Sequence, residues 1–290
     1  MTVSDTLTTR YSEVCERVAR AAKRAGRNPG DIIVVAVTKF AVPEQIKALL
    51  AVGHRDFGEN KAQTLIQHAA VVDEFFTRQS IHLTTRTIRT QEASELLFST
   101  GGMELRPHTA LPSSREGVRW HMIGHVQRNK AKKVAETSRL IHSVDSLRLA
   151  EELQAIAMKR DQPVDVLIQV NSSGEPSKFG CPPAAAIPLA EQISTMINIR
   201  VRGLMTMAAP NKVAEQARPC FSRCRELFEE MTKLRLGENV PFNILSMGMS
   251  GDFEVAISEG ANIVRIGSSI FGQPSVNQQD EPEEPDESEN

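Results

Sequence analysis

Eight short apolar runs, separated by longer segments of helical periodicity, limit the fold of this chain more than any other feature of its sequence. Such alternation is typical of repeated β-α units that build a parallel sheet. The runs at 32–37 (IIVVAV) and 164–170 (VDVLIQV) are almost continuously apolar, as expected for strands covered on both faces. We therefore expect strands at 32–37, 54–57, 118–123, 140–144, 164–170, 201–205, 244–246 and 263–266.

Helical segments are expected between these strands, and one more is expected before the first strand. An open, doubly wound sheet would produce the same local pattern, so the count of eight strands is what favours a closed (β/α)8 barrel of the TIM type. The helix before the first strand, at 7–25, is expected to cap the barrel. The other helices are expected at 43–52, 60–75, 129–135, 146–159, 183–196, 214–233 and 253–259.

Two segments do not fit the repeating pattern. Residues 77–117 are polar, rich in Thr and Arg and longer than a normal connection, so we interpret them as an irregular insertion. Residues 273–290 combine many acids and prolines with almost no apolar side chain, and are expected to be disordered. The barrel domain would then span 1–272.

The composition excludes several classes of function. The 34 basic and 36 acidic residues are interspersed, so no basic stripe indicates a nucleic-acid partner. Residues 1–27 contain no apolar signal core, and no run of about 18 apolar residues suggests a membrane span. A cytoplasmic location is therefore expected, with the four cysteines kept as thiols.

Glycine- and serine-rich loops follow the seventh and eighth predicted strands, where many barrels bind phosphate. They are Ser246 to Asp252 (SMGMSGD) and Arg265 to Ser269 (RIGSS). In the second loop, Gly267 would let the backbone approach an oxyanion, and Ser268 would add a hydroxyl donor. Either loop alone could equally be a tight turn. The occurrence of both loops at these positions favours a phosphate site.

Lys39 lies at the end of the first predicted strand, where its side chain would point into the mouth of the barrel. A desolvated lysine has a depressed pKa and is nucleophilic, as the formation of a Schiff base requires. A strand-end lysine can also extend to water, and that reading would be preferred if Lys39 stood alone. Together with the two phosphate loops, Lys39 indicates a phosphorylated aldehyde as the ligand.

Seven segments in the same order along the chain resemble the pyridoxal phosphate homeostasis proteins, a family of one-domain relatives of the alanine racemase barrel. The resemblance extends from about Ser4 to Gly272. The segments are AVTK at 36–39, FGEN at 57–60, WHMIG at 120–124, QRNK at 127–130, RGLM at 202–205, SMGMS at 246–250 and VRIGS at 264–268. The chain departs from the family pattern at His125, where a proline is usual, and in the length of 77–117.

The resemblance implies a cofactor, pyridoxal 5'-phosphate (PLP), held as an internal aldimine on Lys39. It further implies that Ser250, Gly267 and Ser268 bind the phosphate, that Asn60 lies beside the ring, and that Arg265 lies near the pyridine nitrogen. Guanidinium only donates hydrogen bonds, so that nitrogen should stay unprotonated and the ring should be a poor electron sink. On the residues alone, Arg265 could instead pair with a carboxylate of the barrel.

The resemblance implies a carrier or buffer of PLP with negligible turnover, with PLP-requiring apo-enzymes as further partners and the chain a monomer or weak dimer. The alternative is a PLP-dependent racemase, which needs bases on both faces of the cofactor. The only tyrosine that could supply one is Tyr11, in the first predicted helix. A Schiff-base aldolase acting on a phosphorylated sugar would share the lysine and the phosphate loops.

Three other groups of residues receive weaker interpretations. His121 and His125 are four apart but straddle a strand end, so no metal site is expected. Cys220 and Cys224, on one predicted helix without a nearby histidine, are interpreted as packed or surface thiols. Lys178 could approach a ligand phosphate or carboxylate, or simply belong to a turn.

Overall fold

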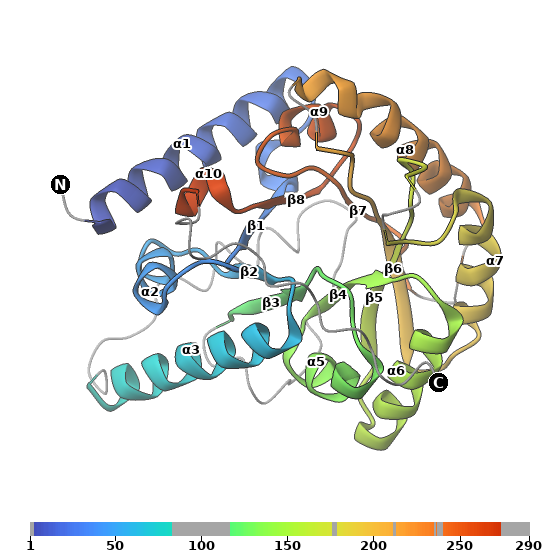
Figure 1. Cartoon of the computed structure of the whole chain (residues 1–290), viewed down its shortest axis with the longest axis horizontal. Helices are drawn as coiled ribbons and strands as arrows, with labels where there is room; N and C mark the ends of the chain where they lie inside the picture. Colours follow the sequence, from blue (N-terminus) through green and yellow to red (C-terminus); the bar gives the residue numbers. More distant parts are fainter. Residues whose placement is uncertain are drawn as a thin grey trace.

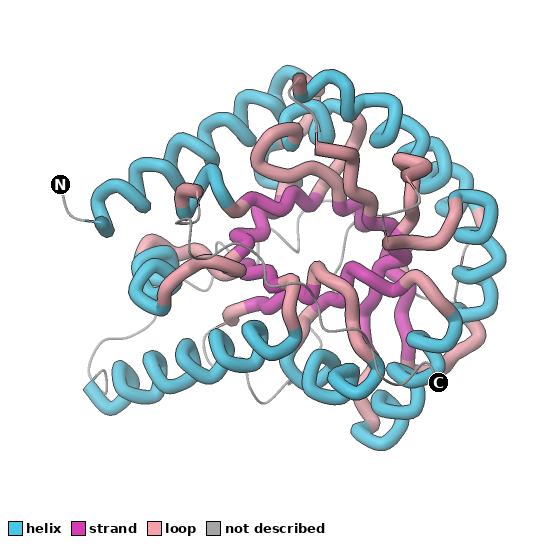
Figure 2. Tube along the Cα trace, viewed as in Figure 1, coloured by secondary structure: helices cyan, strands magenta, loops and turns pink. Residues whose placement is uncertain are grey.

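The structure, a computed structural model, describes residues 3–82, 117–175, 179–210, 213–234, 236 and 240–273. Eight parallel strands pair in sequence order, and the eighth also pairs with the first, so the sheet is a closed barrel. Figure 2 shows the strands as an inner ring surrounded by the helices. The predicted (β/α)8 architecture is confirmed.

The elements follow one another around the barrel in the order of the chain (Figure 1). The strands are β1 (Ile33–Val37), β2 (Asp56–Glu59), β3 (Arg119–Met122), β4 (Leu140–Val144), β5 (Val164–Gln169), β6 (Ile199–Met205), β7 (Ile244–Ser246) and β8 (Ile263–Ile266). The α-helices are α1 (Val3–Arg24), α2 (Pro43–Ala51), α3 (Ala62–His82), α5 (Ala131–Thr137), α6 (Leu147–Arg160), α7 (Pro183–Ser194), α8 (Arg218–Lys233), α9 (Phe253–Ser258) and α10 (Ser268–Phe271).

The strand β2 is the one whose limits differ most from the prediction, since both of its ends are shifted by two residues, whereas β6 only begins two residues early. Strand β2 was expected at 54–57 and lies at Asp56–Glu59. Every residue of β2 is buried although two of the four are acidic. The acids have partners inside the fold, since Asp56 pairs with Arg119 and Glu59 accepts hydrogen bonds from Thr38 and His68. A search for apolar runs cannot recognise a strand of this composition.

The helix α1 does not cap the barrel, contrary to the prediction. It lies in the outer ring of helices and packs against α2, α9 and α10 (Figure 1). The helix that follows β8, α10, has only four residues, so it covers little of the sheet. The apolar side of α1, which includes the buried Leu7, Val14 and Val18, completes the ring there.

The predicted insertion begins later than expected. Helix α3 continues to His82, so residues 77–82 are helical rather than irregular. The remainder of the insertion and the acidic tail lie outside the described residues, except for 117 and 273. Across the ranges that the structure describes, none of the helices is long and apolar enough to cross a membrane.

A buried histidine joins α1 to the barrel. The hydroxyl of Tyr11 lies 2.9 Å from Nδ1 of His54, and Nε2 of His54 lies 2.7 Å from the carbonyl oxygen of Asp56. A carbonyl only accepts, so Nε2–H donates to it, and Nδ1 accepts from Tyr11. Burial lowers the pKa of His54 to about 4, so the ring remains neutral at physiological pH.

This histidine should make the stability of the fold fall in weak acid. The unfolded chain takes up a proton at His54 near its ordinary pKa of 6.5, whereas the folded chain does so only near 4. The unfolded state therefore binds more protons in that window, and the contribution of His54 to the free energy of unfolding decreases as the pH falls. Urea denaturation should show that the free energy of unfolding falls less between pH 7 and pH 5 in His54→Phe than in the wild type, by roughly 2 kcal/mol. An equal pH dependence in both proteins would contradict this assignment.

Candidate functional site

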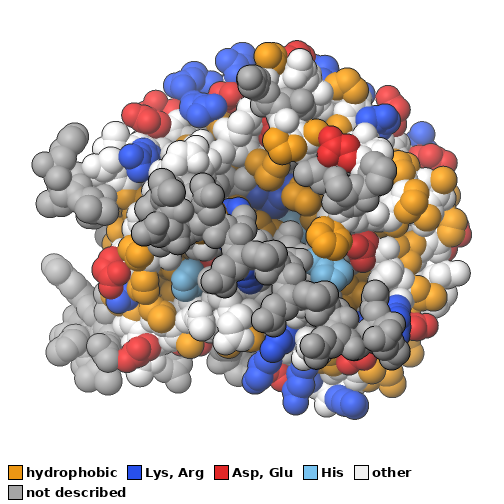
Figure 3. Space-filling view, in the orientation of Figure 1, with side chains coloured by type: hydrophobic (Ala, Val, Ile, Leu, Met, Phe, Trp, Pro, Cys, Tyr) orange, Lys and Arg blue, Asp and Glu red, His pale blue; other side chains and the backbone are white. Residues whose placement is uncertain are grey.

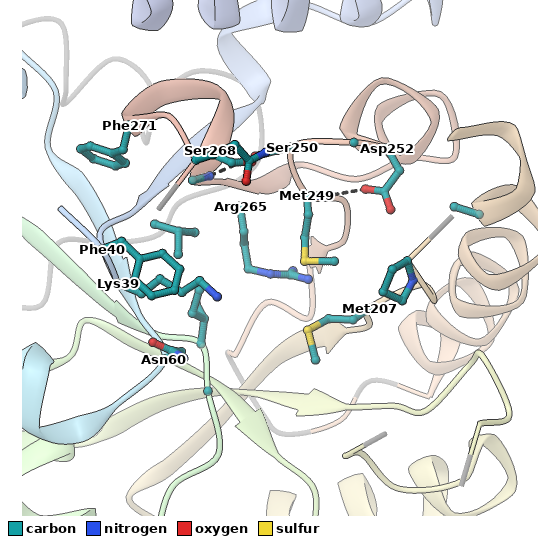
Figure 4. Close-up of a pocket in the computed structure, with 18 of the residues that line it drawn as sticks. Lys39, Phe40, Asn60, Met207, Met249, Ser250, Asp252, Arg265, Ser268 and Phe271 are labelled. Atoms are coloured by element: carbon teal, nitrogen blue, oxygen red, sulfur yellow. Dashed lines mark hydrogen bonds between the residues drawn. The ribbon is translucent and has the colours of Figure 1, made fainter. Parts of the chain in front are cut away.

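A cavity of about 760 Å³ opens beyond the carboxyl ends of the strands. Its lining comes from the ends of β1, β5 and β8 and from the segments that follow β1, β2, β3, β5, β6, β7 and β8, although these lie far apart in the sequence. All six residues predicted to bind a cofactor lie on this one cavity (Figure 4). They are Lys39, Asn60, Ser250, Arg265, Gly267 and Ser268.

The lysine of the cavity is accessible rather than desolvated, contrary to the sequence argument. Strand β1 ends at Val37, so Lys39 lies beyond the buried part of the barrel, and its side chain is exposed. Its amine lies 4.5 Å from the ring centroid of Phe40, a cation–π contact. In Figure 4 the Lys39 side chain points toward the part of the cavity where Arg265 lies.

The segments beneath Lys39 and Asn60 are fixed by a buried carboxylate that sequence reasoning did not single out. Glu59 is fully buried, and its Oε1 accepts hydrogen bonds from the hydroxyl of Thr38 and, at 2.7 Å, from Nδ1–H of His68. Since Thr38 precedes Lys39 and Glu59 precedes Asn60, this contact sets the relative positions of two lining residues. Gly124 packs against the same place, where any Cβ would lie 2.0 Å from the carbonyl oxygen of Asn60.

The loops after β7 and β8 are joined by hydrogen bonds that converge on one serine. The hydroxyl oxygen of Ser250 accepts from the backbone N–H groups of Gly267 at 3.2 Å and Ser269 at 3.3 Å. An oxyanion such as phosphate could replace the Ser250 oxygen as the acceptor of these two N–H groups, and the Ser250 hydroxyl could then donate to it. Asp252 accepts from the N–H of Met249 at 2.6 Å, and burial raises the pKa of Asp252.

Arg265 is a buried cation in the cavity lining, with only 2% of its surface exposed. Its Nη1 donates to the hydroxyl oxygen of Ser246 at 2.6 Å, and its Nη2 donates to the carbonyl oxygen of Thr206 at 2.9 Å. These hydrogen bonds go to neutral acceptors and not to a barrel carboxylate, which was the alternative expectation. Burial lowers the pKa of Arg265 to about 10, so the guanidinium is still charged at neutral pH.

The two histidines considered as metal ligands have separate roles. His121 is buried in the barrel, with Nε2 at 3.1 Å from Asp56 and Nδ1 at 2.9 Å from Nε2 of His142. His125 lies in the cavity wall, where its ring stacks on Phe179 with centroids 4.8 Å apart. The two rings therefore do not converge on a common point.

The remaining sequence candidates lie away from the cavity lining or outside the described residues. Cys220 and Cys224 are buried free thiols in α8. Lys178 falls in the undescribed stretch 176–178. Tyr11 is absent from the cavity lining and uses its hydroxyl on His54.

Charges are mixed on the face shown in Figure 3. Acidic and basic side chains are scattered around its periphery, while hydrophobic, basic and histidine side chains are visible near its centre. No single-sign stripe crosses the part of this face that the structure describes. The positive groups near the centre suit a small anionic ligand better than an extended polyanion.

The chain is similar to known proteins over nearly its full length. The family model for the alanine racemase N-terminal domain matches residues 13–274. The pyridoxal phosphate homeostasis protein of Pseudomonas aeruginosa is 33% identical over 267 residues, which is 92% of this chain and 95% of that protein. The protein of the same name from Aquifex aeolicus is 36% identical over 264 residues, 91% of this chain and 96% of that protein.

One solved structure provides a comparison with a ligand in place. PipY of Synechococcus elongatus, with PLP bound, is similar with a TM-score of 0.63 and 28% identity. The match covers 89% of this chain and 100% of the PipY chain.

Proposed function

This chain belongs to the pyridoxal phosphate homeostasis proteins, within the alanine racemase N-terminal domain family, and we propose that it binds PLP and takes part in PLP homeostasis. The observation that carries the proposal is the convergence on one cavity of an accessible lysine, an amide and hydroxyl cradle, and a buried arginine. PLP offers the three matching groups: an aldehyde, a phosphate and a pyridine nitrogen.

Each of these groups has a residue suited to hold it. Nζ of Lys39 would bond to the aldehyde carbon as a Schiff base, and the aldehyde oxygen would leave as water. Ser250 and Ser268 would donate their hydroxyls to the phosphate, and the N–H of Gly267 would turn to it from the Ser250 oxygen. Arg265 would donate toward the pyridine nitrogen, and Asn60 would lie beside the ring. When bound, PLP supplies an aldehyde and an electron-accepting ring.

We infer that the chain is a carrier of PLP with negligible turnover. The ring accepts electrons best when its pyridine nitrogen is protonated. A proton on that nitrogen would need a hydrogen-bond acceptor, and the Arg265 guanidinium can only donate. Racemisation also requires a second base opposite the lysine. Tyr11, the sole tyrosine of the sequence, is held by His54 away from the cavity lining. The proposal includes a cytoplasmic location and delivery to PLP-requiring apo-enzymes.

The first test concerns the attachment to Lys39. Protein loaded with PLP should absorb at about 420 nm. Borohydride should reduce the C=N bond to a stable amine, which peptide mapping should locate on Lys39. Lys39→Ala should lose both the band and the adduct. Lys47→Ala is the matched control, because Lys47 lies on α2 beside Glu44 and outside the cavity lining.

Two outcomes of this test would overturn parts of the proposal. A colourless protein that cannot be reconstituted with PLP would return the barrel to the alternative of an aldolase for phosphorylated sugars. An adduct mapped to a different lysine would keep PLP binding but remove Lys39 from its assigned role.

The second test concerns the phosphate cradle. Ser250→Ala and Ser268→Ala should each weaken the binding of PLP roughly tenfold to hundredfold, because a hydrogen bond to a charged group is lost or disordered. Binding of pyridoxal, which lacks the phosphate, should change little. Fluorescence or absorbance titration measures both ligands, with Ser194→Ala on the exposed end of α7 as control. Equal losses for PLP and pyridoxal would place the phosphate elsewhere.

The third test separates a carrier from an enzyme. Purified protein loaded with PLP should show no amino-acid racemase or decarboxylase rate above that of free PLP. The assay is chiral chromatography of a set of L-amino acids after prolonged incubation. A clear rate that disappears in Lys39→Ala would establish the racemase-like alternative instead.

A further inference from the structure

Five buried polar side chains form a continuous line of hydrogen bonds across the inside of the barrel. Asp56 of β2 lies 3.1 Å from Nε2 of His121 of β3, whose Nδ1 lies 2.9 Å from Nε2 of His142 of β4. Nδ1 of His142 lies 3.0 Å from the hydroxyl of Ser246 of β7, and that hydroxyl accepts from Arg265 of β8 at 2.6 Å. None of the five residues, taken whole, is more than 7% exposed.

The line spans the interior instead of following neighbouring strands. His142 and Ser246 come from β4 and β7, which are not adjacent in the barrel, so their contact crosses from one wall to the other. The line lies beside an apolar part of the interior, where Val35, Leu167 and Ile244 belong to one buried cluster. Apolar side chains could fill this space without the cost of burying polar groups. The line therefore calls for an explanation other than packing.

With neutral histidines, the chemistry of the two ends gives every hydrogen bond between them one direction. The carboxylate of Asp56 only accepts, so His121 must carry its proton on Nε2. A neutral His121 then accepts at Nδ1 from Nε2–H of His142. A neutral His142 accepts at Nδ1 from the hydroxyl of Ser246, which leaves the Ser246 oxygen to accept from Arg265. In this arrangement each donor meets one acceptor, and both histidines are neutral.

The charges around the line favour this neutral arrangement. Arg119 already donates to both carboxylate oxygens of Asp56, at 2.7 and 2.5 Å, so that carboxylate has its counter-charge. Burial and the nearby Arg265 guanidinium hold the pKa of His142 well below its usual value. Asp252 and Cys224 also face Arg265, and both raise the pKa of its guanidinium against the effect of burial. A proton on His142 would place a second cation against the Ser246 oxygen, which already accepts from Arg265.

We propose that Ser246, His142 and His121, anchored by Asp56, are positioning residues that orient the Arg265 guanidinium toward the ring of the bound ligand. The proposal rests on the proposed function, because the ring is that of PLP. The hydroxyl of Ser246 cannot turn away from Arg265, since its proton is held by His142. The guanidinium donates to Ser246 and Thr206, so its orientation is fixed. The N–H groups that it presents to the cofactor therefore point in one direction.

The proton placement can be tested on the protein without any cofactor. ¹⁵N NMR of the histidine rings at neutral pH should show His121 and His142 as neutral Nε2–H tautomers, with assignments from His121→Gln and His142→Asn. A cationic His121, or an Nδ1–H tautomer of His142, would overturn the proposed direction of the line. This result does not depend on whether PLP binds.

The effect on Arg265 can be tested by the absorbance of PLP-loaded protein as a function of pH. A nearby fixed cation lowers the pKa of the bound chromophore, so loosening Arg265 should raise the pH midpoint of its spectral change. Ser246→Ala and His142→Phe should each raise it by at least about half a unit. His142→Asn, which keeps an acceptor near the position of Nδ1, should restore much of the wild-type midpoint.

The matched control is His54→Phe, another substitution of a buried histidine by phenylalanine. His54 contacts the backbone of Asp56 but not its carboxylate, so the midpoint should remain at the wild-type value. An unchanged midpoint in PLP-loaded Ser246→Ala and His142→Phe would overturn the positioning role while leaving PLP binding intact. If His142→Phe does not fold, the smaller change Ser246→Ala decides. Failure of the wild-type protein itself to bind PLP would instead refute the proposed function.

Discussion

The pairing of β1 with β8 is the constraint on which the rest of the structure depends. Ile33 pairs with Ile263 and Ala36 with Ile266, so the two strands lie in parallel register although more than two-thirds of the chain separates them. The pairing removes the free edges of the sheet and forces all strand ends onto one rim. It also brings Lys39, two residues beyond β1, beside the loop that begins at Gly267. A Cβ at Gly267 would lie 3.3 Å from the carbonyl oxygen of Val37, so the contact is close.

Closure creates a second requirement, which is to fill the interior. An apolar cluster occupies part of it, and charged or polar side chains occupy the rest. Such side chains are tolerated because they are paired: Asp56 with Arg119, and Asp165 with Arg202 at 3.2 Å. The polar groups thereby acquire fixed directions, because a buried donor without an acceptor is costly. Arg265 is at the end of the hydrogen-bonded line that begins at Asp56, where the barrel interior meets the cavity.

The sequence predicted the fold well because most strand residues of a parallel barrel are apolar, and β4, β7 and β8 begin and end where expected. It failed at β2, where Asp56 and Glu59 are buried through contacts with distant residues. It also misplaced α1, because the shortness of α10 that leaves room for it was not visible in the sequence. All such errors concern contacts between segments, which periodicity does not record.

The residues of the candidate site also fall into two groups, those that the sequence predicted and those that depend on contacts between distant segments. Lys39, Gly267 and Ser268 were predicted from their positions at strand ends, and these positions alone suffice to bring them together on a rim. The relation of His142 to Ser246 could not be predicted, because it depends on which walls of the barrel face each other and on the direction of each side chain. Residues on the rim determine which groups a ligand can meet. Residues beneath the rim determine the direction in which Arg265 can donate, and a site that holds a ligand in one orientation depends on both.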